Sequence, residues 1–136
     1  SQVAHNCQLI VTTTPSETAL FNADDIQAGT HITAVGSDTA SKQELSGDLL
    51  QKADLIIADS LPQSKSRGEV YQAVKGGFIQ SNDVYELGTA IQDPKLQRQN
   101  DHQITIVDLT GVAVQDIMIA KSVYLQHLLN QQHAQL

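Results

Sequence analysis

The sequence predicts an α/β fold: a parallel sheet of about four strands between layers of helices, followed by a long C-terminal helix. Four short runs of β-branched and aliphatic residues have the composition of strands buried on both faces, and they lie at 7–14, 31–35, 54–59 and 103–108. Segments with helical spacing separate most of these runs, and a strand–helix–strand unit makes its two strands parallel. The 136 residues are enough for a single domain with a substantial core.

Composition excludes several classes of protein. Eight Lys and Arg residues stand against fifteen Asp and Glu residues, which gives a net charge of -7 and argues against a nucleic-acid-binding or anionic-membrane surface. Cys7 is the single cysteine, so a disulfide within the chain and a cysteine-based zinc site are both excluded. No apolar run approaches the length of about 20 residues that crosses a bilayer. We therefore expect a soluble, cytoplasmic protein without nucleic-acid or membrane partners.

The first half of the chain is predicted to form, in order, a strand, a turn, a strand, a helix and a strand. Pro15 ends the first strand, and 22–26 looks like one capped helical turn closed by Gly29. After the second strand, apolar residues at helical spacing predict a crossover helix: Leu45, Leu49, Leu50 and Ala53. This helix returns the chain to the third strand, at 54–59.

The second half predicts three helices around the fourth strand. The first covers 64–74 and is stopped by Gly76-Gly77, and the next covers 83–91, with Val84, Leu87 and Ile91 as its apolar stripe. The last helix runs from about 112 to about 131, with apolar residues on more than one face. Such a helix needs a packing partner on a second side.

All four predicted strands end in small polar residues, and parallel strands bring such ends to one edge of the sheet. These ends are Thr12-Thr13-Thr14 with Ser16, Gly36-Ser37-Asp38, Asp59-Ser60, and Asp108 with Thr110-Gly111. Hydroxyls, carboxylates and backbone amides at one edge indicate a nucleotide-type site, although the same residues also serve as turn residues and helix caps. Asp38 is the leading candidate, because the glycine-containing turn directs it into the crevice. Its alternative role is to cap the following helix.

A motif typical of dinucleotide-binding domains is absent. Such a domain opens with Gly-x-Gly-x-x-Gly after its first strand, followed about 20 residues later by an acid for the ribose. Neither is present in this sequence, so a dinucleotide fold would begin here roughly halfway through. The five histidines show no metal-ligand spacing, and no Gly-x-Ser-x-Gly elbow or P-loop occurs. We expect no metal site.

The order and spacing of several motifs resemble the ornithine cyclodeaminase/μ-crystallin family, over nearly the whole chain. The motifs are Ile10-Val11-Thr12-Thr13-Thr14-Pro15-Ser16, His31-Ile32-Thr33-Ala34-Val35-Gly36-Ser37-Asp38 with Lys42-Gln43-Glu44-Leu45, Arg67-Gly68-Glu69, Glu86-Leu87-Gly88, and Val107-Asp108-Leu109-Thr110-Gly111-Val112-Ala113-Val114-Gln115-Asp116. The resemblance implies a homodimeric, NAD-dependent enzyme with a Rossmann domain and a dimerisation domain made from both chain ends. The namesake reaction converts L-ornithine to L-proline and ammonia. Relatives reduce ketimines or cyclic imines with NADH or NADPH, oxidise alanine, or bind thyroid hormone.

The resemblance also assigns roles to individual residues. Asp38 matches the catalytic acid/base, and Lys42 and Thr110 match substrate-binding positions; the alternative for Lys42 is a solvated lysine at a helix start. Positions that match cofactor contacts are Thr14, Val35, Gly36, Ser37 and Leu109. Leu109 departs from the pattern, because many members have a serine there.

The family's glycine turn, ribose-binding acid and dimerisation domain are not in this sequence. The resemblance therefore implies that residues 1–136 are the C-terminal part of an NAD(P)-binding Rossmann domain. We expect the isolated chain to be inactive, to bind NAD weakly or not at all, and to self-associate through an unpaired first strand or the last helix. Two other readings stay open: a non-catalytic binding protein of the μ-crystallin type, and a domain that only mediates assembly. The substrate is not fixed by the sequence.

Overall fold

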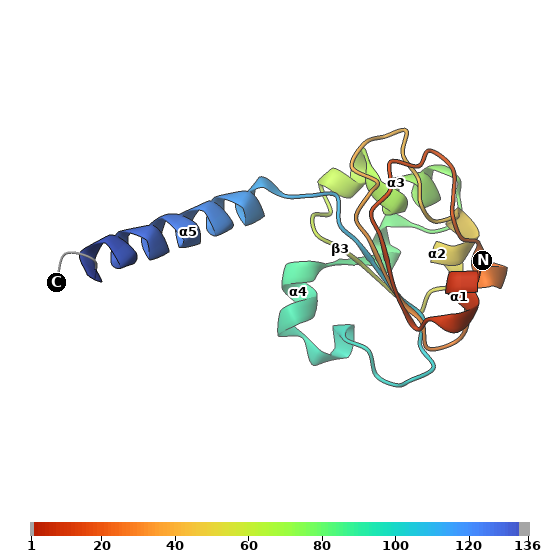
Figure 1. Cartoon of the computed structure of the whole chain (residues 1–136). Helices are drawn as coiled ribbons and strands as arrows, with labels where there is room; N and C mark the ends of the chain where they lie inside the picture. The colour runs from red at the N-terminus through yellow and green to blue at the C-terminus, as the bar shows by residue number, and fades with distance from the viewer. Residues whose placement is uncertain (1, 134–136) are drawn as a thin grey trace.

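The computed structural model describes residues 2–133 and contains a five-stranded sheet, with helices against the sheet and one long helix extending from it (Figure 1). The strands are β1 (Leu9–Thr12), β2 (His31–Ala34), β3 (Leu55–Ala58), β4 (Val84–Glu86) and β5 (Thr105–Asp108). Their order is β1-β2-β5-β3-β4, and every neighbouring pair is parallel. The predicted α/β class and parallel sheet are confirmed, with one strand more than the four expected.

The longer helices after the first strand follow the predicted order with shifted ends, and the first helix, at residues 2–6, was not predicted. They are α1 (Gln2–Asn6), α2 (Gly47–Lys52), α3 (Gly68–Lys75), α4 (Leu87–Gln92) and α5 (Ala113–His133), with short 3-10 turns η1 (Ala23–Asp25), η2 (Gln63–Lys65), η3 (Ser81–Asp83) and η4 (Pro94–Leu96). Asn22 caps η1 as expected, by accepting from the backbone N–H groups of Asp24 and Asp25. Leu45 is outside the crossover helix and instead bridges to Phe21. The helix predicted at 64–74 is split into η2 and α3.

The helix predicted at 83–91 is wrong in its first third. Val84–Glu86 forms the edge strand β4, which pairs with β3, and helix α4 begins only at Leu87. The spacing of Val84, Leu87 and Ile91 fits a helix, but Val84 and Tyr85 also favour a strand when a sheet edge is available. Val84 is buried on one face of the sheet and Tyr85 is exposed on the other, which is strand periodicity.

The sheet buries one face far more completely than the other. Side chains of one face form the core with α2 and α3, and these include Ile10, Ile32, Ile106 and Ile56. On the opposite face, Leu9 is 67% exposed and Val11 is 59% exposed. The expectation that β1 is buried on both faces is therefore wrong within the described residues, because α4 and η4 lie on the β3 and β4 side of this second face and leave β1 uncovered.

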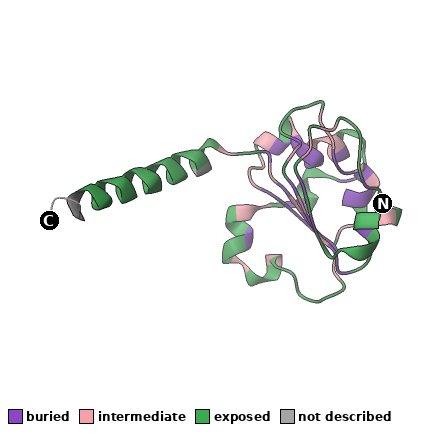
Figure 2. Cartoon of the chain, in the orientation of Figure 1, coloured by how far each residue is buried: buried purple, intermediate pink, exposed green. Residues whose placement is uncertain are grey.

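Helix α5 projects from the body of the molecule and is exposed on all sides (Figures 1 and 2). Its large apolar side chains are between 37% and 66% exposed, including Ile117, Ile119, Tyr124 and Leu128. Within residues 2–133 it lacks the packing partner that its apolar faces require. No helix among those described is both long and apolar enough to span a membrane.

We expect the isolated chain to self-associate. Within the described residues β1 pairs with β2 alone, so its outer edge presents free backbone groups, and α5 adds an exposed apolar surface. Light scattering should show a mass above that of the monomer, which falls on dilution. A Leu128→Lys substitution should reduce association through α5, whereas Lys121→Gln, on the same helix, should not. A strict monomer at moderate concentration would contradict this expectation.

Candidate active site at the carboxyl edge of the sheet

The carboxyl ends of the strands meet at one edge, as the sequence predicted. Val35 donates its backbone N–H to the carbonyl of Thr12 at 2.9 Å, and Leu109 donates to Ala34 at 2.8 Å. Asp59, after β3, donates to the carbonyl of Asp108 at 3.1 Å. These backbone bonds place the ends of β1, β2, β5 and β3 side by side, so the polar residues that follow them share one rim.

A pocket of about 300 Å³ lies between the ends of β1 and β2. It brings together five of the predicted site residues, and its lining is Thr13, Thr14, Pro15, Val35, Gly36, Asp38 and Lys42. Three other predicted residues do not line it. Ser37 is buried and donates its hydroxyl to the carbonyl of Lys42 at 2.7 Å, while Leu109 and Thr110 follow β5 farther along the rim.

Asp38 and Lys42 form an ion pair at the pocket, with 2.6 Å between Lys42 Nζ and Asp38 Oδ1. The Asp38 side chain is 55% exposed and that of Lys42 is 26% exposed. The hydrogen bond from Lys42 holds the pKa of the Asp38 carboxyl below its ordinary value, so the group is ionised near neutral pH. The alternative that Asp38 caps a helix is wrong, because α2 begins nine residues later, at Gly47. Lys42 likewise lies outside any helix start.

Sequence reasoning missed the role of Glu44, which is fully buried behind this pocket. Its carboxylate accepts hydrogen bonds from the Thr12 hydroxyl at 2.7 Å, the Thr14 hydroxyl at 2.8 Å and the Gly36 N–H at 2.9 Å, as well as from the Thr14 N–H. Burial raises the pKa of Glu44, but these hydrogen bonds together outweigh burial and leave the pKa below its ordinary value. Glu44 therefore ties the end of β1 to the end of β2 as a charged group.

Two further carboxylates continue inward from Glu44. Glu69, in the first turn of α3, accepts from the backbone N–H groups of Glu44 at 2.7 Å and Leu45 at 2.9 Å. Asp108, at the end of β5, accepts from the Val70 N–H at 2.9 Å, and its Oδ1 has no hydrogen-bond partner within the described residues. We call Glu44, Glu69 and Asp108 the carboxylate relay, because Asp108 binds the start of the helix that carries Glu69, and Glu69 binds the backbone of Glu44.

The inner members of the relay hold their protons more tightly than ordinary carboxyls. Burial raises the pKa of Glu69 to about 7, with the nearby negative charges of Asp108 and Glu44 acting in the same direction. Burial likewise raises the pKa of Asp108 to about 6, with Asp59 and Glu44 adding to the shift. Keeping all three carboxylates ionised would cost free energy, because their negative charges repel one another in a buried environment.

Acidification from about pH 8 to about pH 5 is expected to stabilise the chain. The folded pKa values of about 7 for Glu69 and about 6 for Asp108 lie above the ordinary values of 4.5 and 3.8 that apply when the chain unfolds. The folded state therefore binds more protons in this range, so the free energy of unfolding is highest at the acid end and falls as the pH rises through the folded pKa values. Glu69 alone should contribute roughly 3 kcal/mol to the difference.

Urea unfolding at several pH values would measure this dependence. The contributions of Asp38 and Glu44, whose pKa values are lowered, are lost only at more acidic pH, whereas the lowered pKa of His31 opposes the effect within this range and reduces its size. Glu69→Gln should reduce the pH dependence to the part contributed by Asp108, whereas Glu17→Gln, at an exposed position, should leave it intact. A free energy of unfolding that rises between pH 5 and pH 8 would refute the prediction.

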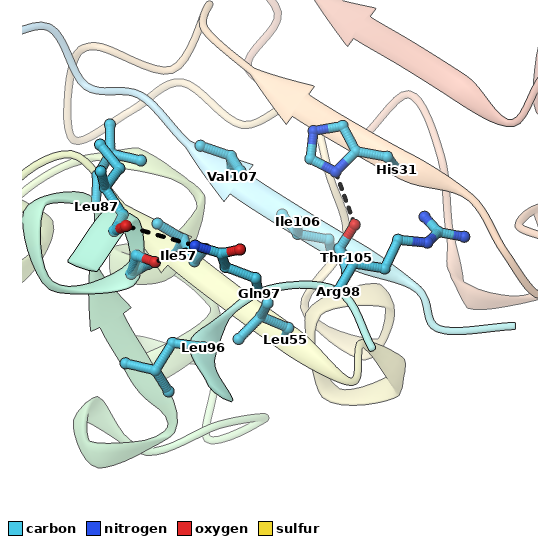
Figure 3. A pocket seen from close by; sticks show the side chains of 12 residues that line it. His31, Leu55, Ile57, Leu87, Leu96, Gln97, Arg98, Thr105, Ile106 and Val107 are labelled. Carbon is cyan, nitrogen blue, oxygen red and sulfur yellow. Dashed lines mark hydrogen bonds between the residues drawn. The ribbon is translucent and has the colours of Figure 1, made fainter. Parts of the chain in front are cut away.

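A second pocket, of about 400 Å³, lies on the less covered face of the sheet beneath α4 and η4 (Figure 3). Its wall is mainly aliphatic, and His31 bonds there through Nδ1 to the Thr105 hydroxyl at 2.7 Å. Burial and the charge of Arg98 lower the pKa of His31. The pocket holds no carboxylate and none of the predicted site residues, so we place the chemistry at the rim instead. The described residues contain no cluster of metal-ligating side chains.

Comparison with known proteins identifies the family of the chain. A sequence model of the ornithine cyclodeaminase/mu-crystallin family matches residues 1–130. The chain belongs to this family. It is 42% identical over 125 residues to an alanine dehydrogenase of Archaeoglobus fulgidus, a match that covers 91% of the chain and 38% of that protein.

Solved structures of family members share the fold. An archaeal alanine dehydrogenase dimer with bound NAD superposes with a TM-score of 0.85 at 43% identity, over 92% of this chain and 39% of that one. The iminosuccinate reductase of Paracoccus denitrificans in complex with NAD+ gives a TM-score of 0.75 at 38% identity, over 85% of this chain and 35% of that one. The chain thus spans less than half the length of these family members, and its sheet superposes on the Rossmann-like fold of these NAD-bound structures.

Proposed function

We propose that residues 1–136 form the C-terminal part of the NAD-binding domain of an enzyme that interconverts an α-amino acid and its imine, with Asp38 as the acid/base. The observation that carries this proposal is the ionised Asp38 carboxylate, paired with Lys42 at the pocket between β1 and β2. The alanine dehydrogenase and iminosuccinate reductase relatives support this class of reaction.

The pocket suits the nicotinamide end of the cofactor together with a small polar substrate. Pro15 and Val35 give it an apolar wall, with Val35 39% exposed, and Asp38 and Lys42 supply its charges. A flat ring packs well against an aliphatic wall at the carboxyl edge of a parallel sheet. When bound, NAD would accept a hydride from the substrate α-carbon or return it. Thr14, Val35 and Gly36 would contact the cofactor. Ser37, Leu109 and Thr110 would support this edge of the sheet.

Asp38 has the properties that the proton transfer requires. When an α-amino acid loses a hydride from its α-carbon, its ammonium nitrogen must also lose a proton to reach the iminium. The Asp38 carboxylate is ionised and exposed, so it can accept this proton and return it in the reverse direction.

Lys42 has two functions in this proposal. Its ammonium keeps Asp38 ionised, and it can also bind the carboxylate of an incoming amino acid. Conversion of ornithine to proline would use the same first step: the side-chain amine then attacks the imine carbon, ammonia leaves, and the hydride returns to the cyclic imine. We propose ornithine as one candidate substrate, beside alanine and cyclic imines.

Measuring NADH formation and consumption would test the proposed activity. The protein expressed from its complete reading frame should turn over at least one of alanine, ornithine or a cyclic imino acid with NAD(H). Tight binding of these compounds without turnover would overturn the enzymatic role and favour a binding protein of the μ-crystallin type.

We expect the isolated chain of 136 residues to bind NADH weakly or not at all. No Gly-x-Gly-x-x-Gly turn is present in its sequence, and that turn and the following helix supply the main electrostatic attraction for the pyrophosphate. Fluorescence titration with NADH measures the affinity. A dissociation constant in the micromolar range would contradict this expectation while leaving the role of Asp38 open to the assay above.

A further inference from the structure

The loop between β2 and α2 carries both charged residues of the pocket without any regular secondary structure of its own. Lys42 lies two residues before Glu44, and the backbone on either side of Glu44 is fastened to other segments. Gln43 donates its N–H to the Ser16 carbonyl at 2.9 Å, and the Glu44 carbonyl accepts from the Leu20 N–H at 2.7 Å. The Glu44 N–H in turn donates to Glu69 Oε1. Glu44 is therefore fixed in place, and the rest of the loop is positioned relative to it.

Each carboxylate oxygen of Glu44 faces one backbone N–H, which can only donate, and one threonine hydroxyl. Oε1 accepts from the N–H and the hydroxyl of Thr14, and Oε2 accepts from the Thr12 hydroxyl and the Gly36 N–H. An amide nitrogen in place of either oxygen would point its hydrogens at a backbone N–H, so an amide would lose at least one of these bonds, whereas the ionised carboxylate accepts all four. This arrangement favours the ionised carboxylate over an amide of the same shape.

The two strand ends approach each other too closely for any side chain at position 36. A Cβ atom on Gly36 would lie 2.1 Å from the Thr14 carbonyl oxygen and 2.6 Å from Glu44 Oε1. Thr14 and Gly36 are both walls of the pocket, so the hydrogen bonds to Glu44 set the distance between these walls.

Asp38 is linked to Glu44 through short hydrogen-bonded segments on both sides. Its N–H donates to the Gly36 carbonyl at 3.1 Å, and Ser37 donates its hydroxyl to the Lys42 carbonyl at 2.7 Å. The two ends of the turn that holds the Asp38–Lys42 ion pair thus lie beside Gly36 and beside Glu44.

We propose that Glu44 is the positioning residue of this site: its buried carboxylate sets the width of the pocket and the geometry of the Asp38–Lys42 pair. Its kinetic consequence rests on the proposed function, but its effect on Asp38 does not. A residue that served only to stabilise the fold would lower the unfolding temperature without changing the titration of Asp38.

The first experiment follows the Asp38 carboxyl carbon by NMR during a pH titration of the 136-residue chain. In Glu44→Gln the ion pair loosens, and we expect the pKa of Asp38 to rise by about one unit. Glu17→Gln is the matched control, because it removes one negative charge from an exposed position on the loop after β1, and it should leave the titration unchanged.

A second variant keeps the experiment decisive if Glu44→Gln does not fold. Thr12→Val removes one hydrogen bond to Glu44 at a buried position that does not line the pocket, and it preserves the shape of the side chain. It should shift the Asp38 titration in the same direction by a smaller amount. An unchanged titration in every variant that folds would overturn the proposal.

The second experiment uses the protein expressed from its complete reading frame. For Glu44→Gln we expect kcat to fall by about 10- to 100-fold and the Asp38 limb of the pH–rate profile to move upward, while Glu17→Gln behaves as the parent. A folded Glu44→Gln variant with unchanged kcat and pH profile would also overturn the positioning role. If the parent has no turnover, the proposed function fails, and the NMR titration alone decides the role of Glu44.

Discussion

Replacing Asp38 with asparagine is expected to lower kcat of the protein expressed from its complete reading frame by about 10²- to 10⁴-fold. Asparagine keeps nearly the same shape and can still contact Lys42, but it cannot accept the proton that the substrate nitrogen must release. Steady-state kinetics in both directions would measure the loss. Binding of the amino acid should change less than turnover, because the substitution removes a proton-transfer group and leaves the rest of the pocket intact.

The matched control for this substitution is Asp24→Asn, at an exposed carboxylate in η1, away from the residues that line the pocket. It should leave kcat unchanged. If Asp38→Asn retained turnover within a few-fold of the parent, Asp38 would not be the acid/base.

The second large effect is expected for Gly68→Ala, which should destabilise the chain by roughly 3 kcal/mol or more. Gly68 has a φ of 93°, a conformation that side chains other than glycine rarely adopt. An added Cβ would lie 2.5 Å from Asp108 Oδ2 and 2.7 Å from Thr110 Cγ2. The substitution would therefore push the start of α3 away from Asp108, which holds the Val70 N–H.

Urea unfolding of variants at two other glycines would separate the cost of backbone strain from the cost of the close contact with Asp108. Gly77 has a φ of 76° but no atom near its added Cβ, so Gly77→Ala should cost only the backbone strain, about 1 kcal/mol. Gly88 lies in α4 with open space around it, and Gly88→Ala should be neutral or slightly stabilising. If Gly68→Ala were no less stable than Gly77→Ala, the close approach of the added Cβ to Asp108 and Thr110 would cost nothing beyond the backbone strain.

The strands and the rim were predictable because they depend on local composition and on a general rule. Continuous β-branched runs at β1, β2, β3 and β5 indicate strands, and parallel strands place their carboxyl ends together. This reasoning was sufficient to bring Asp38 to the same edge as Thr14 and Thr110. The edge strand β4 was not predicted, because three residues are too few to show the alternation of a strand and the spacing of the neighbouring apolar residues favours a helix.

The carboxylate relay was beyond sequence reasoning for a different physical reason. Glu44 follows a polar loop, where a glutamate is normally solvated, and nothing local indicates that it is fully buried. Its partners lie at the end of β1 and just after β1 and β2, and those of Glu69 come from a loop about 25 residues away. Only the assembled sheet shows that these separate polar residues satisfy one another.

The large sequence separation between the hydrogen-bonded residues of the carboxylate relay affects the order in which parts of the chain fold. Its hydrogen bonds join positions separated by 24 residues at Leu45–Glu69, 32 at Thr12–Glu44 and 38 at Val70–Asp108. Closing such loops costs entropy before the contacts form, so the rim assembles late and together with the sheet. Amide hydrogens of Thr14, Gly36 and Val70 should consequently exchange with solvent through the same cooperative opening, although they belong to three different segments.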